Sequence, residues 1–214
     1  IDFMVALADE IEARTIIDVG CGTGRLATQL LRDDRRVIGV DPAPAMIAVA
    51  RRRKNAERVE WIVGDASAIT TTDGDLVVMT GNISGYIVED DDWLKVLSLV
   101  RNSLKPGGRF AFSSRNPADR AWERWGDNIR LESGRVNVAA ALEEGQVHAE
   151  PSDGSLVYGD EVLIADSTYR IRTLEELKGS LVRTGFQVEH VYGGWDRRPL
   201  ASAGEDLVFI ARRR

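Results

Sequence analysis

The sequence predicts an α/β fold, a doubly wound sheet with helices on both faces, from three observations. Short apolar runs alternate with helix-like segments along the first half of the chain, which is the pattern of a parallel sheet. A glycine-rich bend directly follows the first apolar run, and an acidic residue follows each of the next two. The chain has 214 residues, 43% hydrophobic and 29% charged, so it can form a single domain, residues 1–214, with a buried core.

The expected elements follow one another in the order that such a sheet requires. Phe3, Leu7 and Ile11 recur every fourth residue, which predicts a leading helix. Thr173 with Glu176 three residues later is a capping box and marks the start of a late helix. We expect strands at 16–19, 37–40, 59–63, 76–79, 109–114, 186–192 and 206–211, and further helices at 26–31, 43–54, 90–104 and 174–185.

Between about residues 117 and 172 the pattern changes. Apolar residues alternate from Val136 to Leu142, and turn signals stand at 152–154 and 158–160. This pattern predicts an antiparallel β insertion after the fifth strand of the main sheet.

Composition narrows the classes of function. With 28 basic and 34 acidic residues the net charge is -6, which argues against nucleic-acid binding by electrostatics and favours a small-molecule partner. Cys21 has no second cysteine to pair with, and no apolar run is long enough to cross a membrane. We therefore expect a cytoplasmic protein, and the start at Ile1 leads us to expect further residues upstream. No spacing of histidine, cysteine and acid suggests a metal, and His148 and His190 stand outside any motif.

The glycine-rich bend is the sharpest feature of the sequence. The segment 18–24, Asp-Val-Gly-Cys-Gly-Thr-Gly, leads from a strand into a helix. Glycine lets the backbone turn tightly and lets a ligand lie against it, while the helix start offers free N–H donors. The NAD-binding fingerprint needs a glycine or alanine one residue beyond Gly24, where this chain has Arg25. A dehydrogenase is therefore the less favoured interpretation.

Acidic residues end the second and third predicted strands. Asp41 could accept hydrogen bonds from both hydroxyls of a ribose, the alternative being an N-cap for the helix from Ala43. Asp65, in Gly64-Asp65-Ala66, could accept from an adenine amine, the alternative being a simple turn aspartate. Because the carboxyl ends of neighbouring parallel strands face one crevice, we expect the three strand ends to meet around one ligand.

Together these segments resemble class I S-adenosylmethionine-dependent methyltransferases. Residues 17–24 look like the first motif of that family, Gly39-Val40-Asp41 like the second, and residues 64–66 like its adenine motif. Residues 104–110 are similar to the turn before the family's fifth strand, and Gly185-Phe186 with the two last strands resembles its C-terminal hairpin.

The resemblance implies a seven-stranded, mostly parallel sheet with the last strand antiparallel. It also implies S-adenosyl-L-methionine as cofactor, released as S-adenosyl-L-homocysteine, with the Gly20–Gly24 bend facing the methionine moiety and upstream residues covering the cofactor. The cofactor-binding residues are then expected to be Asp18, Gly20, Cys21, Gly22, Thr23, Gly24, Asp41, Pro42, Met46, Gly64, Asp65, Ala66, Thr80 and Gly81.

The acceptor side is less defined. The family places the segment 80–83 beside the transferable methyl group. Here this segment is Thr-Gly-Asn-Ile rather than an Asn-Pro-Pro-Tyr motif, which argues against amide or base nitrogens as the methylated atoms. We expect a small or medium-sized acceptor, capped by residues 117–172. In-line methyl transfer needs alignment more than a general base. Acceptor-side candidates are Asn82, Tyr86, Arg115, Asn116, Trp122 and Tyr169.

Three of these assignments have open alternatives. Trp122, like Trp125, could equally fill the core, and the segment 115–117 could be a capped turn. For the whole chain, the alternatives are an NAD-dependent oxidoreductase and a module that binds S-adenosylmethionine without catalysis.

Overall fold

The computed structural model describes residues 1–124, 131–132, 135–141, 164–202 and 204–214. Within these ranges there is no helix with the length and apolar character needed to span a membrane.

The main sheet has seven strands in the order β3-β2-β1-β4-β5-β10-β9. β10 runs antiparallel to both of its neighbours, and the other pairs are parallel, which confirms the predicted fold class. The strands are β1 (Thr15–Val19), β2 (Arg36–Asp41), β3 (Val59–Val63), β4 (Gly74–Met79), β5 (Leu104–Arg115), β9 (Phe186–Tyr192) and β10 (Asp206–Arg213). The helices are α1 (Asp2–Glu10), α2 (Arg25–Gln29), α3 (Pro44–Ala50), α4 (Asp90–Ser103) and α5 (Leu174–Arg183).

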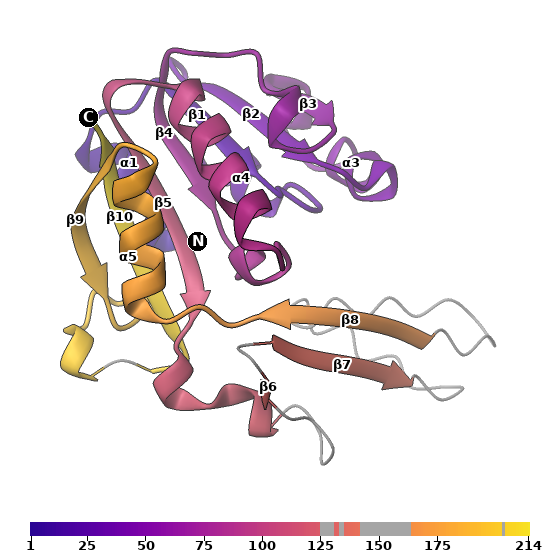
Figure 1. Ribbon diagram of the computed structural model, residues 1–214. Coiled ribbons are helices and arrows are strands. Elements are labelled where there is room, and N and C mark those ends of the chain that lie inside the picture. Colours follow the sequence, from indigo (N-terminus) through magenta and orange to yellow (C-terminus); the bar gives the residue numbers. More distant parts are fainter. Residues whose placement is uncertain (125–130, 133–134, 142–163, 203) are drawn as a thin grey trace.

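Two cores cover the two faces of this sheet. On β4, Val77 and Met79 pack with residues of α4 and α5, whereas Leu76 and Val78 pack with residues of α1 and α2. Successive strand residues point to opposite faces, so a strand that is covered on both sides reads as a continuous apolar run. Figure 1 shows α4 and α5 side by side across one face of the sheet. This sandwich holds the strand ends rigidly in place.

Two predicted boundaries were wrong by four residues or more. The helix expected over 43–54 ends at Ala50, and Arg53 instead donates hydrogen bonds to the backbone and hydroxyl oxygens of Thr23. The strand expected from residue 109 begins at Leu104, which pairs with Gly74. Residues 105–108 form an irregularity before regular pairing resumes at Arg109, so the expected turn lies inside β5 as an interruption of its ladder.

The insertion contributes a second, antiparallel sheet of β6 (Leu131–Glu132), β7 (Arg135–Ala141) and β8 (Ile164–Arg170), in agreement with the predicted antiparallel pairing. It lies beyond the carboxyl end of β5 (Figure 1). Leu142, His148 and the turn signals at 152–154 and 158–160 fall outside the described residues.

Candidate functional site

Backbone hydrogen bonds join the carboxyl ends of the first three strands. The Gly20 N–H donates to the Val40 carbonyl at 2.7 Å, and the Gly64 N–H donates to the Asp41 carbonyl at 3.0 Å. The Gly22 N–H donates to the Asp41 side chain at 2.8 Å. The glycine bend after β1 and the ends of β2 and β3 therefore form one connected group, at the edge where open α/β sheets bind their ligands.

Asp41 is held at the centre of this group. One carboxylate oxygen accepts from Gly22 and the other accepts from the Ala43 N–H at 2.9 Å. Ala43, rather than Asp41, is the N-cap residue of α3, so the alternative interpretation of Asp41 as the cap does not apply. A carboxylate has about four acceptor positions, and these two bonds leave positions that could receive ribose hydroxyls.

Asp18, at the end of β1, has an unusual environment. Its side chain is 1% exposed, and neither carboxylate oxygen has a hydrogen-bond partner of normal geometry in the described part of the chain. Burial, together with the charge of Asp41, raises the pKa of Asp18 to about 7. A buried carboxylate without partners is costly, and the ammonium group of a bound amino acid moiety would supply the missing donors and charge.

The glycines of the site fall into two kinds. A Cβ on Gly20 would strike Ile83, and one on Gly24 would strike Trp61, so close packing requires these two glycines. Gly22 and Gly81 have positive φ values of 52° and 72°, and a Cβ there would meet nothing within 4 Å. Gly22 and Gly81 thus leave room for a ligand to lie against the backbone.

The remaining predicted cofactor residues make different contacts within the fold. Asp65 accepts hydrogen bonds from the backbone and hydroxyl of Ser67, both through Oδ1, which lower its pKa. The Thr23 hydroxyl accepts from Arg53. Ala66 belongs to the core. Burial raises the pKa of the Cys21 thiol, which makes it a poor nucleophile.

Three further members of the predicted set surround the same edge. Pro42 is exposed, Met46 is half-buried on α3, and Thr80 is half-buried directly after β4. The structure therefore gathers the predicted cofactor residues along the ends of β1 to β4, and their contact with a cofactor stays a prediction.

Of the acceptor-side candidates, four meet at the end of β4. The Tyr169 hydroxyl donates to the Asn82 carbonyl at 2.7 Å, and the Tyr169 ring lies edge-on to Tyr86 with centroids 5.1 Å apart. Asn82 and Arg115 are both bonded to one carboxylate, that of Asp206. These contacts place residues from β5, β8, β10 and the segment after β4 around one point.

The other two candidates are placed differently. Asn116 caps the turn at 117–119 through its side-chain oxygen and donates from its side-chain nitrogen to the Gly204 carbonyl. Both ends of its amide are therefore hydrogen-bonded within the protein. Trp122 is 4% exposed and belongs to neither of the two main cores. Trp125 lies outside the described residues.

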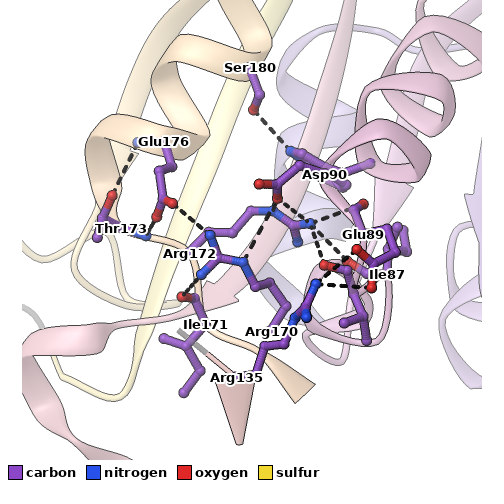
Figure 2. Close-up of polar contacts among 12 residues, drawn as sticks. Ile87, Glu89, Asp90, Arg135, Arg170, Ile171, Arg172, Thr173, Glu176 and Ser180 are labelled. Carbon is purple, nitrogen blue, oxygen red and sulfur yellow. Dashed lines mark hydrogen bonds and ion pairs between the residues drawn. The ribbon is translucent and has the colours of Figure 1, made fainter. Parts of the chain in front are cut away.

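A buried arginine fixes the segment between β4 and α4. Arg172 is 2% exposed and donates to the carbonyls of Ser84 and Ile87, each at 2.8 Å, and to Asp90. Its guanidinium lies over the Trp93 ring, 5.3 Å from the centroid. Figure 2 shows Arg172 at the centre of these contacts.

The second sheet is bonded to the same segment. Arg135 on β7 pairs with Glu89 at 2.8 Å, and Arg170 on β8 pairs with Glu176 at 2.6 Å and lies 3.8 Å from Asp90 (Figure 2). Ion pairs thus join the insertion to the residues at the start of α4 and α5.

Sequence reasoning missed Arg53, Asp206 and Arg172. Nothing local marks Arg53 or Asp206, because their partners lie far along the chain. Arg172 is likewise unmarked, because it stands in the mixed run Arg170-Ile171-Arg172-Thr173.

A doubly wound sheet with an antiparallel seventh strand, a glycine bend and acidic strand ends defines the class of Rossmann-like methyltransferases. The comparisons with known proteins agree. Residues 16–108 match the family model described as a methyltransferase domain, so this part of the chain carries a methyltransferase domain.

Individual relatives extend the similarity beyond residue 108. The cypemycin N-terminal methyltransferase of Streptomyces sp is 24% identical over 95% of this chain and 84% of that protein. An S-adenosylmethionine-dependent methyltransferase structure from Clostridium acetobutylicum ATCC 824 aligns with a TM-score of 0.76 at 17% identity, over 99% of this chain and 89% of that chain. The sugar N-methyltransferase KedS8 from Streptoalloteichus sp ATCC 53650 aligns at 0.70 and 19% identity, over 100% of this chain and 86% of that chain.

The chain spans less than half the length of seven other curated relatives that it matches, between 29% and 49%.

Proposed function

We propose that this chain moves a methyl group from S-adenosylmethionine to a free amine of a small or medium-sized acceptor. The observation that carries the donor side is the carboxylate of Asp41, which accepts from the Gly22 N–H at the end of β2, next to the end of β3. Bound S-adenosylmethionine supplies a methyl group on a positively charged sulfonium.

The residues fit this cofactor. Asp18 offers an unpartnered carboxylate for the ammonium group, and Asp41 offers acceptors for the ribose. Gly22 and Gly81 leave open backbone on which the methionine portion can lie. Asp65 retains one carboxylate oxygen for the adenine amine. We propose no metal in this reaction.

Support for nitrogen as the acceptor atom comes from the relatives that cover the whole chain. One is named as an N-terminal methyltransferase and one as a sugar N-methyltransferase. The nitrogen lone pair of an amine is available to attack a methyl group, whereas that of an amide is delocalised. The lack of an Asn-Pro-Pro-Tyr motif argues against amide nitrogens and therefore does not argue against an amine. The net charge of -6 fits a small acceptor better than a nucleic acid.

We further propose that residues 117–172 cap the acceptor. The ion pairs of Arg135 and Arg170 with the segment before α4, together with the contact of Tyr169 with Asn82, support this role.

Asp41 provides the test of the donor site. Asp41→Ala removes an ionised acceptor worth roughly 1.5–3 kcal/mol, so we expect calorimetric titration to show S-adenosylhomocysteine bound about 10- to 100-fold more weakly. Asp41→Asn keeps the shape and one acceptor and should lose less. Asp73→Ala, at an exposed position, is the matched control. Unchanged affinity in Asp41→Ala would remove Asp41 from the site.

A further inference from the structure

Asn82 has one polar atom that the fold leaves unused. The residue follows β4 and is 8% exposed, and its Oδ1 is buried without a hydrogen-bond partner among the described residues. The other half of the same amide is bonded, since Nδ2 donates to Asp206 at 3.0 Å. An unsatisfied buried acceptor costs free energy and calls for an explanation.

Asp206 sets which way the amide faces. Because β10 is antiparallel to β5, the first residue of β10 lies at the edge where β4 and β5 end. One Asp206 oxygen accepts from Asn82 and from Arg115 at 3.2 Å, and the other accepts from the Trp195 indole at 3.2 Å. Turning the amide over would bring Oδ1 against this carboxylate, so Oδ1 is held on the opposite side as an acceptor.

The backbone of Asn82 is fixed as well. Its N–H donates to the Ser113 hydroxyl at 3.3 Å, and its carbonyl accepts from Tyr169. Its φ of 57° lies in the left-handed region, which asparagine tolerates better than most residues. The acceptor oxygen is therefore oriented before any ligand arrives, and preorganised dipoles are the kind that contribute to catalysis.

We propose that Oδ1 of Asn82 accepts an N–H from the amine that is methylated, and that Asp206 is the positioning residue for that amide. This inference rests on the proposed function. The neutral amine donates one N–H to Asn82 and keeps its lone pair for the methyl carbon. As the N–C bond forms and the C–S bond breaks, the positive charge passes from sulfur to nitrogen, and the ammonium product then releases a proton to water.

The chemistry of this contact favours the transition state. The N–H becomes more acidic as nitrogen gains charge, so its hydrogen bond to Asn82 strengthens during the reaction. Removing the oxygen should therefore lower kcat more than it raises KM. Acceptors with no N–H, such as tertiary amines, cannot make the contact.

Two variants separate this role from a purely structural one. Asn82→Gly removes the amide while keeping a residue that accepts a positive φ, and we expect kcat to fall about 10- to 100-fold. Asp206→Asn keeps the shape but weakens the hold on the amide, and a fall of about tenfold in kcat is expected. Asn102→Ala, on the exposed face of α4, is the control. All three should bind S-adenosylhomocysteine with wild-type affinity.

The probes are D-glucosamine, the dipeptide amide Ala-Ala-NH₂, their N-acetylated forms and a hydroquinone, each with methyl-labelled S-adenosylmethionine. A second readout without turnover is the ¹⁵N signal of the Asn82 side chain in the S-adenosylhomocysteine complex, which should shift when a free amine is added. We expect transfer to free amines only, with the kcat losses above.

The outcomes distinguish the two proposals. If the wild-type chain does not bind S-adenosylhomocysteine, or transfers methyl to none of the free amines, the proposed function and this inference are both overturned. Transfer to free amines with unchanged kcat in Asn82→Gly, or no shift of the Asn82 signal, would overturn the inference alone.

Discussion

Asp18 carries its carboxylate in an environment that disfavours a charge. Its side chain is buried, burial and the charge of Asp41 raise its pKa to about 7, and neither oxygen has a hydrogen bond of normal geometry within the described residues. Such an arrangement destabilises the protein without cofactor and is relieved when a cationic group binds. Stability and ligand affinity are therefore opposed at this residue.

Asp18→Asn should reveal this opposition through pH. The folded-state pKa is raised above the unfolded value of 3.8, so the cofactor-free protein loses stability as pH rises from about 4 to 7. Urea unfolding should show this loss in the wild type and a smaller one in Asp18→Asn, which at pH 8 should be the more stable by up to about 4 kcal/mol.

The same variant should bind S-adenosylhomocysteine about 10- to 100-fold more weakly, because it no longer neutralises the ammonium group. If Asp18→Asn binds normally, or loses as much stability with pH as the wild type, the assignment of Asp18 to the ammonium group fails.

At the scale of elements, the segment between β4 and α4 depends on a residue far along the chain. Arg172 donates to the carbonyls of Ser84 and Ile87 and pairs with Asp90, so one side chain ties this segment to the start of α4. Removing the donor to a buried carbonyl typically costs about 1–3 kcal/mol.

Arg172→Met should therefore lower the free energy of unfolding by about 2–3 kcal/mol, because two carbonyls lose their donor, and speed amide exchange across residues 84–90, as measured by hydrogen exchange with mass spectrometry. S-adenosylhomocysteine affinity should change little, because Gly22 and Asp41 lie on other elements. Arg183→Met, exposed on α5, is the matched control. Equal exchange in the two variants would show that Arg172 does not hold this segment.

At the scale of the whole molecule, cofactor binding and folding are linked. A ligand at 100 times its dissociation constant adds about 2.7 kcal/mol of stability. For a chain of this size that corresponds to a rise of about 5–10 °C in Tm. S-adenosylhomocysteine should give this shift in a thermal melt and NAD should give none. A shift with NAD alone would instead favour the oxidoreductase.

The sequence predicted the sheet well because its strands are covered on both faces, which turns burial into continuous apolar runs such as 76–79. The Asp41 site was also predictable, since its parts follow strand ends. The contact between Asn82 and Asp206 was not, because it joins residues 124 positions apart. The end of α3 was missed for a related reason, since Arg53 leaves helical geometry to bond Thr23.

Because β10 is antiparallel to β5, its first residue lies next to the end of β5, so residues late in the chain reach the proposed acceptor side. The proposed donor contacts all come from residues 18–81, whereas the proposed acceptor contacts come from Asn82 and Tyr86 after β4 and from the ends of β5 and β8 and the start of β10. A chimaera that exchanges the residues after 81 would therefore replace the proposed acceptor contacts and keep the proposed donor contacts.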